Sequence, residues 1–312
     1  MVAREISRHR EELSIDPTRI AGVVVTYFPD DGLAARLTTI SALVERLIVI
    51  DNSAEVEVAA SIQVICDRLG ADLVCNPRNI GLAAALNRGV DYARDNRCDS
   101  VLFFDQDTVP EPCFREKMKS IVATYAGDAP LGIVGANYLL TRFPTTIFHT
   151  HRARQAAPAD HVITSGSLYD LAMIDALGPF RDDFFIDGID IEYGWRAMTK
   201  GYAVLRSVEP LMRHDHGRVT RHVLFGKTFG TMNYPAFRHY FIGRNSAVLF
   251  RAYLTRLPTL TLGLLFKQVK SAGAVVLFEA DKLGKLKSMA MGLLHGMVGS
   301  MDHNPLTRAQ RR

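Results

Sequence analysis

The first hundred residues alternate between short apolar runs rich in β-branched residues and longer stretches with helical periodicity. The predicted strands are residues 20–26, 47–50, 72–75 and 101–104. The predicted helices between them are residues 32–44, 56–69 and 82–96. Buried strands that alternate with helices are typical of right-handed βαβ crossovers in a parallel sheet. The pattern therefore predicts an α/β domain.

The rest of the chain changes character twice. A further strand is expected over residues 203–208, and residues 141–160 form an irregular stretch that suits a loop over a ligand crevice. After Leu211 the pattern is predominantly helical, and residues 257–301 are apolar with five lysines. No uncharged span there reaches about 20 residues, so no membrane-spanning helix is expected. These patterns divide the chain into an N-terminal extension (1–18), an α/β domain (19–217) and a basic, mainly helical region (218–312).

Composition and charge narrow the class of protein. With 312 residues, 48% of them hydrophobic and 22% charged, the chain has the composition of a globular protein. Residues 1–196 carry 19 basic and 28 acidic side chains, a net charge of −9, whereas residues 197–312 carry 18 and 5, a net charge of +13. A basic region of this kind attracts nucleic acid, anionic lipid or a phosphorylated substrate, and the charge alone does not choose among them.

The cysteines and the N-terminus indicate a compartment. The four cysteines include no C-x-x-C pair, and the first residues contain no apolar signal-peptide core. We therefore expect neither a disulfide framework nor secretion, and a reducing cytosol is the default.

Two carboxylates stand directly after the apolar run VLFF at residues 101–104. They are Asp105 and Asp107, separated by Gln106. Burying an isolated carboxylate is unfavourable, so paired acids at the tip of a core strand usually have a cation nearby. The alternative is a solvated turn, since Asp is common in turns and Pro110 is able to open a helix.

Polar residues also follow other predicted strands. The three polar strand ends are Thr26-Tyr27, Asp51-Asn52 and Asp105-Gln106-Asp107. Because ligands collect beyond the carboxyl ends of parallel strands, these residues converge on one crevice, which favours the cation-binding interpretation. Carboxylate oxygens suit Mg²⁺ or Mn²⁺, and such ions bridge a protein carboxylate to a diphosphate.

Acids gather again in DFFIDGIDIEYGWR, residues 183–196, where a helical pattern begins. Helix capping explains one or two of the four acids, because Asp at a helix start satisfies free N–H groups and the helix dipole. A carboxylate held at a helix start beside aromatic residues is also suited to act as a general base, within ~3 Å of a substrate hydroxyl. Asp190 is the candidate for this role.

Imidazoles follow the predicted strand at residues 203–208, in the stretch RHDHG. A single histidine at such a place is more often structural or solvated than functional. In combination with Asp105 and Asp107, however, His214 is a candidate third metal ligand.

Taken in order, the motifs VVVTYFPD, LIVIDNS, NIGLAAALNRG, VLFFDQD, FFIDGIDIEYGWR and HDHG resemble those of the family 2 glycosyltransferases. Within that family, the DQD form and the block Asn79, Gly81, Ala85 and Asn87 are most similar to bacterial rhamnosyltransferases. The resemblance covers about residues 20–217, with a weaker match at residues 238–253. It is highly specific for glycosyl transfer and less specific for rhamnose.

The resemblance implies a GT-A fold, a mostly parallel central sheet flanked by helices and followed by a helical C-terminal extension. The residues that it implies for the nucleotide-sugar donor are Thr26, Tyr27, Asp51, Asn52, Asn79, Gly81, Asn87 and Gln106. It implies that Asp105, Asp107 and His214 bind a divalent metal, Mg²⁺ or Mn²⁺.

The same resemblance places the catalytic base at Asp190. The acceptor-side or secondary candidates are Asp187, Glu192, Trp195 and Arg196. Many family members have Glu immediately before the base, whereas this chain has Ile189 there. The choice between Asp187 and Asp190 therefore stays open.

The implied reaction is an inverting glycosyl transfer, since the acceptor hydroxyl attacks from the face opposite the leaving diphosphate. A β-linked dTDP-L-rhamnose donor then gives an α-L-rhamnoside. The implied acceptor is a glycan or a polyprenyl-diphosphate-linked glycan of bacterial surface polysaccharide synthesis, such as O-antigen or cell wall, and no nucleic acid is implied. We expect a cytoplasmic protein, with its basic C-terminal region in peripheral contact with the inner face of the cell membrane. The opposing interpretation is that this region packs on the first domain or on a second subunit, so oligomerisation stays open.

Two other functions compete with glycosyl transfer. A sugar nucleotidyltransferase generally has a Gly-rich loop with Arg or Lys after its first strand, and here that place reads TYFPDDG. A non-catalytic sugar-nucleotide or glycan-binding module does not need both the DQD stretch and Asp190.

Overall fold

The computed structural model of the chain describes residues 19–140, 154–214, 220–224, 227–303 and 305–306. Its contacts divide the chain into two compact units. Among the described residues, the first unit contains 19–140, 154–180 and 190–214, and the second contains 181–189, 220–224, 227–303 and 305–306. The predicted N-terminal extension, residues 1–18, lies outside the described residues.

The first unit is built around a mixed sheet, which has nine strands among the described residues. The strands are β1 (Ile20–Thr26), β2 (Arg46–Asp51), β3 (Asp72–Cys75), β4 (Ser100–Asp105), β5 (Val109–Pro110), β6 (Leu131–Leu140), β7 (Ala156–Pro158), β8 (Ser167–Asp170) and β9 (Ala203–His214). Their order is β3-β2-β1-β4-β8-β6-β9-β5, and β7 also pairs with β9. Strands β3, β2, β1 and β4 are parallel, and β8 runs antiparallel to both β4 and β6.

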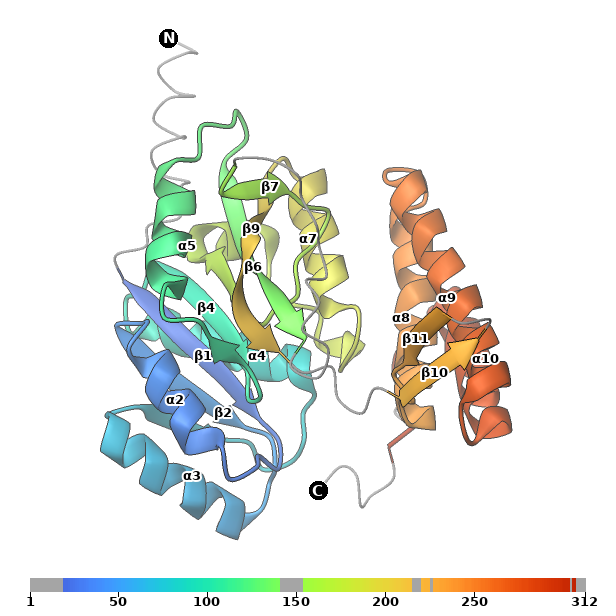
Figure 1. The fold of residues 1–312 in the computed structure, drawn as a ribbon, viewed down its shortest axis with the longest axis horizontal. Helices are drawn as coiled ribbons and strands as arrows, with labels where there is room; N and C mark the ends of the chain where they lie inside the picture. The colour runs from blue at the N-terminus through green and yellow to red at the C-terminus, as the bar shows by residue number, and fades with distance from the viewer. Residues whose placement is uncertain (1–18, 141–153, 215–219, 225–226, 304, 307–312) are drawn as a thin grey trace. The chain divides into compact units, whose positions relative to one another are not determined.

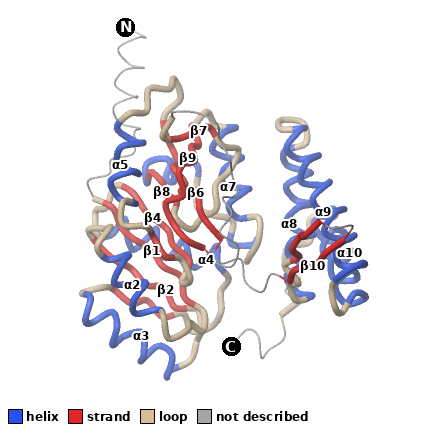
Figure 2. The backbone as a smooth tube through the Cα atoms, in the orientation of Figure 1, coloured by secondary structure: helices blue, strands red, loops and turns tan. Residues whose placement is uncertain are grey.

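Helices cover both faces of this sheet, which gives three layers (Figures 1 and 2). One face carries α2 (Leu33–Ser41), α3 (Val56–Leu69) and α5 (Phe114–Ala123). The other carries α4 (Leu82–Asp95), α6 (Leu171–Leu177) and α7 (Ile189–Thr199). Since successive strand residues point to opposite faces, Leu102 and Phe104 join the α2, α3 and α5 core, while Phe103 points to the other layer.

Strand register lines up the polar strand ends. Thr26 pairs with Asp51 across β1 and β2, and Val25 pairs with Asp105 across β1 and β4. The carboxyl ends of β1, β2 and β4 therefore meet at one edge of the sheet, where an open α/β sheet binds its ligands.

The second unit begins with a 3₁₀ turn at Asp182–Phe184 and continues with an antiparallel hairpin and three helices. The hairpin is β10 (Thr220–Leu224) with β11 (Lys227–Thr231), and the helices are α8 (Ala236–Tyr253), α9 (Pro258–Phe278) and α10 (Lys282–Val298). A Cβ atom at Gly292 or Gly296 of α10 would overlap the backbone of α8 at Tyr240 or Arg244. These glycines therefore let the two helices approach closely.

Most of the predicted elements are confirmed, and several boundaries are corrected. Residues 20–26, 56–69 and 72–75 form the predicted elements with the predicted boundaries. The strand expected at 203–208 continues to His214, because β6 and β5 pair with its second half. The region after Leu211 is not helical from its start, since the β10–β11 hairpin precedes the helices.

The irregular stretch expected at residues 141–160 is only partly described. Residues 141–153 lie outside the described residues, and Ala156–Pro158 form β7 on the edge of β9. The sheet has parallel pairings among β3, β2, β1 and β4 and between β6 and β9, and β8 enters antiparallel between β4 and β6.

The contact between α4 and β1 yields a stability prediction. Gly89 faces Val23, and a Cβ atom at this glycine would overlap the buried, stiff Val23 side chain. We expect Gly89→Ala to lower the free energy of unfolding by about 1–3 kcal/mol, as overpacking does. Thermal unfolding measures this change.

Gly263 in α9 is the matched control, because a Cβ atom there meets nothing within 4 Å. Gly263→Ala should be neutral or stabilising by up to about 1 kcal/mol, since Ala favours the helix. An unchanged melting temperature for Gly89→Ala would contradict the close approach.

Candidate functional site

A buried carboxylate network marks the ends of β1 and β2. Asp51 is fully buried, and its Oδ1 accepts hydrogen bonds from Thr26 Oγ1 at 2.9 Å and from Ser53 Oγ at 2.7 Å. Its Oδ2 is also buried and has no hydrogen-bond partner in the part of the chain that the structure describes. Buried acceptors are rarely left unsatisfied, so Asp51 Oδ2 is an acceptor suited to a ligand.

Asn52 ties together the loops around this network. Its Nδ2 donates to the Gly81 carbonyl at 3.1 Å, and its Oδ1 accepts from Asn76 Nδ2 at 2.7 Å. Asn79 Oδ1 accepts from the Gly81 amide at 2.9 Å, and Gly81 adopts a φ of 88° just before α4. Asn52 and Asn79 thus shape the loop that leads into α4.

Asn87 holds a more distant backbone segment. Its Nδ2 donates to the Phe180 carbonyl at 2.8 Å, and its Oδ1 accepts from the Phe180 amide at 2.9 Å. This two-way bond fixes the chain just before it leaves the first unit at Phe180. A direct role of Asn87 in donor binding stays a prediction.

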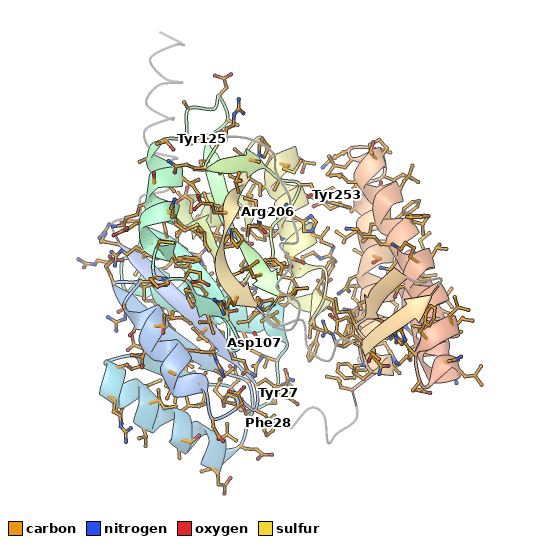
Figure 3. All side chains as sticks on the ribbon, viewed as in Figure 1. Tyr27, Phe28, Asp107, Tyr125, Arg206 and Tyr253 are labelled. Atoms are coloured by element: carbon orange, nitrogen blue, oxygen red, sulfur yellow. The ribbon has the colours of Figure 1, made fainter. Side chains whose placement is uncertain are left out.

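Gln106, the central residue of the DQD stretch, links the end of β4 to the end of β1 by hydrogen bonds. Its Oε1 accepts from the Tyr27 amide at 2.7 Å, and its Nε2 donates to the Tyr27 carbonyl at 3.1 Å. Arg36 Nε donates to the Gln106 carbonyl at 2.5 Å. Tyr27 and Phe28, labelled with Asp107 in Figure 3, are 39% and 42% exposed, and their rings meet edge to face. The hydrogen bonds of Gln106 therefore tie the partly exposed Tyr27 to the DQD stretch.

Asp105, Asp107 and His214 form a cluster suited to a metal ion. Their candidate ligand atoms all lie within 4.8 Å of one another. His214 Nε2 is 3.7 Å from Asp105 Oδ2, and His214 Nδ1 is 3.5 Å from Asp107 Oδ1. The His214 side chain is only 8% exposed, whereas the two carboxylates are 36% and 43% exposed. The carboxylates thus leave room for further oxygen ligands, as Mg²⁺ and Mn²⁺ require.

Hydroxyl groups orient the histidine. Thr108 Oγ1 lies 3.1 Å from His214 Nδ1 and 2.6 Å from Ser165 Oγ, which accepts from the Asp105 amide at 3.0 Å. When His214 Nδ1 donates to Thr108, the lone pair of Nε2 faces Asp105. This is the tautomer that a metal ligand needs, and a hydrogen bond to the other ring nitrogen is the usual way to fix it.

Asp190 lies half-buried in the first turn of α7. Its negative charge acts on the buried Tyr169. Burial raises the pKa of Tyr169 well above its ordinary value, and the charge of Asp190 raises it further. Tyr169 packs edge to face with Phe103 of β4, at 5.2 Å between ring centroids, and with Tyr193 of α7, at 5.8 Å. An aromatic core therefore joins the strand that carries Asp105 to the helix that carries Asp190.

Asp187, the alternative base, has a different environment. Both of its carboxylate oxygens accept from Arg238 of α8, at 3.0 Å and 2.5 Å. The Asp187 backbone has a φ of 66°, and its carbonyl accepts from Asn245 Nδ2 at 2.7 Å. Asp187 is thus held in a bidentate ion pair within the second unit, whereas Asp190 belongs to the first.

The secondary candidates Glu192, Trp195 and Arg196 lie along α7. Glu192 accepts from Arg196 through both carboxylate oxygens, at 3.1 Å and 2.5 Å. Arg196 Nη1 also donates to the Leu177 and Pro179 carbonyls, and Trp195 is 2% exposed. These contacts anchor α7 to the chain after α6, so they support the position of Asp190. Acceptor contacts of the three residues stay a prediction.

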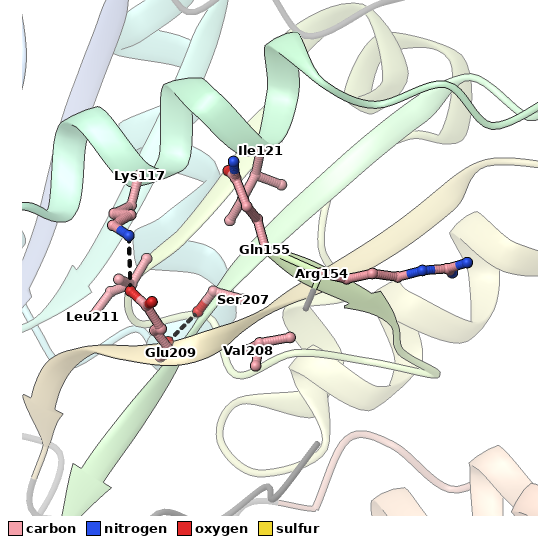
Figure 4. Close-up of a pocket in the computed structure, with 8 residues that line it drawn as sticks. All are labelled: Lys117, Ile121, Arg154, Gln155, Ser207, Val208, Glu209 and Leu211. Carbon is pink, nitrogen blue, oxygen red and sulfur yellow. Dashed lines mark hydrogen bonds and ion pairs between the residues drawn. The ribbon is translucent and has the colours of Figure 1, made fainter. Parts of the chain in front are cut away.

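A separate cavity of about 270 Å³ lies on β9, between its pairings with β5 and β7 (Figure 4). Lys117 of α5 and Glu209 of β9 form an ion pair of 3.0 Å at this cavity. None of the sequence-predicted site residues lines it. The cluster of Asp105, Asp107 and His214 is therefore distinct from this cavity.

Sequence reasoning missed several supporting residues. Thr108 and Ser165 orient His214, and Arg36 holds the backbone of Gln106. Thr108 directly follows the DQD stretch, so its place in the sequence was a signal that it lies beside the site. Ser165 and Arg36 come from distant segments, and no local pattern identifies them.

The fold is that of the GT-A glycosyltransferases. The family model described as glycosyl transferase family 2 matches residues 23–166 of the chain. The matched range includes most of β1 and all of β2, β4 and the DQD stretch, whereas Asp190 and His214 lie beyond it.

Relatives support the same class. The chain is similar to a protein of Shigella flexneri named dTDP-rhamnosyl transferase RfbF, with 22% identity over 90% of this chain and 96% of that one. The fold is similar to TarS of S. aureus, residues 1–349, solved with UDP-GlcNAc, with a TM-score of 0.56, 10% identity and coverage of 91% of this chain and 89% of that one. It is also similar to the mannosyltransferase PcManGT of Pyrobaculum calidifontis, solved with GDP-Man and Mn²⁺, with a TM-score of 0.53, 15% identity and coverage of 96% and 94%.

The carboxylate cluster yields a metal-binding prediction. We expect Asp105→Asn and Asp107→Asn each to weaken Mn²⁺ binding at least about tenfold, because each removes one anionic oxygen ligand. Calorimetric titration of the full chain with Mn²⁺ measures the affinity.

The exposed Asp95, at the end of α4, provides a control of the same chemical change. Asp95→Asn should bind Mn²⁺ as the unaltered protein does. Equal Mn²⁺ affinity in all four proteins would remove the metal assignment.

Proposed function

We propose that the protein is an inverting glycosyltransferase that moves L-rhamnose from dTDP-L-rhamnose to a glycan or lipid-linked glycan acceptor of a bacterial surface polysaccharide. The observation that carries the glycosyl transfer is the cluster of Asp105, Asp107 and His214 at the carboxyl edge of the sheet. The rhamnose donor is supported by the relative named dTDP-rhamnosyl transferase and by the DQD form of the motif.

The metal cluster gives the donor diphosphate its binding site in this proposal. Two carboxylates and an imidazole suit Mn²⁺ or Mg²⁺, and a relative of the same fold was solved with a nucleotide sugar and Mn²⁺. The ion supplies positive charge against the charge that grows on the leaving diphosphate. Thr108 lies within hydrogen-bond distance of His214, and Asp105 and Asp107 are partly exposed beside it.

The nucleoside lies at the ends of β1 and β2 in this proposal. A thymine ring offers an N–H donor, and Asp51 Oδ2 is a buried acceptor that lacks a described partner. Thr26 holds the other carboxylate oxygen, and this bond fixes the orientation of the Asp51 group. The exposed Tyr27 ring is available to pack on the base.

Asp190 is the proposed catalytic base. It is half-buried at a helix start, beside the aromatic core that leads to the metal cluster. Asp187 is less suited, because the Arg238 guanidinium occupies both of its oxygens. Asp190 accepts the proton of the acceptor hydroxyl as that oxygen attacks the anomeric carbon.

We expect Asp190→Asn to lower kcat by about 10²–10⁴-fold with little change in donor affinity, since the amide keeps the shape but does not accept the proton. Asp187→Asn should instead lower the melting temperature, because it breaks the bidentate pair with the partly buried Arg238. Steady-state kinetics, donor titration and thermal unfolding are measured on both variants. A larger kcat defect in Asp187→Asn than in Asp190→Asn would reverse the assignment.

The donor is tested with a panel of nucleotide sugars. We expect dTDP-L-rhamnose to bind and to be hydrolysed or transferred in the presence of Mn²⁺, and removal of the metal by a chelator to abolish this turnover. With a glycan acceptor, nuclear magnetic resonance should show an α-L-rhamnoside.

Other outcomes separate the competing functions. Preferred turnover of another nucleotide sugar would keep glycosyl transfer but remove rhamnose. Release of diphosphate from dTTP and a sugar 1-phosphate would indicate a nucleotidyltransferase. Saturable binding without hydrolysis or transfer would indicate a binding module.

A further inference from the structure

Helix α9 presents its more apolar side outward. Its buried stripe contains the polar residues Thr261 and Gln268. Its exposed side instead carries Leu262, Leu265, Phe266, Val269, Val276 and Leu277. At 3.6 residues per turn, these six side chains fall within an arc of roughly 120° on the helix surface. The most exposed of them are Phe266 at 65% and Val269 and Leu277 at 64% each.

An outward apolar face of this extent is unusual for a helix that meets only water. A large apolar patch normally marks a protein interface or a membrane contact. By length and composition, α9 is the one helix among the described residues that is able to cross a membrane, with a mean hydropathy of 1.4 in its best window. Only 17% of that window is buried in the structure.

The charged side chains within α9 are all positive. Residues 254–278 contain Arg256, Lys267 and Lys270 and no acid. Lys267 and Lys270 are exposed, and at 3.6 residues per turn both lie on one side of the apolar arc, with Lys270 at its border. An apolar face bordered by lysine matches a membrane surface with anionic lipid, where the apolar chains insert and the long lysine side chains reach the headgroups.

The same residues favour a helix that lies on the membrane rather than across it. Lys267 and Lys270 stand near the middle of the 21-residue helix, so a spanning arrangement would bring both charges toward the bilayer centre. The opposite stripe is packed on protein, since Gln268 Nε2 donates to Ser246 Oγ of α8 at 2.9 Å. The helix therefore has one side for protein and one side for lipid.

The lysines of α10 do not all contribute. Lys285 is 4% exposed, and its Nζ donates to Glu279 Oε2 at 2.8 Å, so it holds the start of α10 rather than facing lipid. Leu283, at 85% exposure, extends the apolar surface at the start of α10.

We infer that the exposed face of α9 docks the protein on an anionic lipid surface, with the helix axis in the membrane plane. The contact is peripheral and combines insertion of Phe266 and its apolar neighbours with attraction of Lys267 and Lys270 to the headgroups. It is independent of the donor, because no residue of the metal cluster takes part.

The test is sedimentation of the full chain with lipid vesicles, either pure phosphatidylcholine or phosphatidylcholine mixed with phosphatidylglycerol. We expect pelleting with the anionic vesicles at low salt and release at high salt, where charges are screened. Phe266→Asp combined with Val269→Asp should weaken vesicle binding by at least roughly tenfold, and Lys267→Gln combined with Lys270→Gln by roughly tenfold. Both changes are at exposed positions, and circular dichroism verifies the fold.

Matched controls come from the first unit. Val56 and Val64 are exposed apolar residues of α3, so Val56→Asp combined with Val64→Asp makes the same chemical change elsewhere. The exposed Arg68 and Lys200 provide the charge control, as Arg68→Gln combined with Lys200→Gln. Both control variants should bind the anionic vesicles as the unaltered protein does.

Three results would overturn the inference. The first is failure of the unaltered protein to pellet with either vesicle type at low salt. The second is a dimer in solution that Phe266→Asp with Val269→Asp converts to a monomer, with no effect on vesicle binding, which would assign the face to a second copy. The third is vesicle binding that only detergent reverses, which would indicate a spanning helix. Loss of donor turnover has no bearing on any of these readouts.

Discussion

Electrostatic repulsion between Asp105 and Asp107 is the constraint on which the rest of the site depends. Two like charges at the end of an apolar strand are stable together only beside positive charge or a cation. The fold meets this requirement by completing a cluster suited to a cation with His214, which β9 brings from more than a hundred residues away. Strand β9 extends beyond its predicted end and pairs there with β5. This extension brings the His214 imidazole to the two carboxylates.

Rigid packing then sets the distance between the metal cluster and the proposed base. Phe103, Tyr169 and Tyr193 contact one another in sequence, so a shift of α7 would disturb the core beside β4. Only two residues lie between Asp187 and Asp190, yet Asp187 is paired with Arg238 in the second unit and Asp190 lies in the first. The two carboxylates are therefore suited to different tasks: Asp187 to hold its loop, and Asp190 to accept a proton.

The sequence predicts those parts of the molecule that rest on local pattern. The β-α alternation up to Asp105, the DQD stretch and the start of α7 all follow from periodicity and from residue type. Pairing between distant strands does not, and the antiparallel entry of β8 between β4 and β6 is set by such pairing. The two hydrogen bonds between Asn87 and Phe180 are likewise not predictable from local pattern, because the partners are 93 positions apart in the sequence.

The uneven distribution of charge along the chain is consistent with two different partners for its two parts. Residues 1–196 carry a net charge of −9 and include the acids of the metal cluster, so a diphosphate donor approaches them favourably only with a cation present. Residues 197–312 carry +13, and the exposed lysines of α9 lie beside an apolar face. An acceptor with a polyprenyl diphosphate tail is confined to a membrane surface, where a docked enzyme meets it by diffusion in two dimensions. Under the proposed function, the acidic part therefore selects a metal-bound donor from water, and the basic part brings the enzyme to the acceptor.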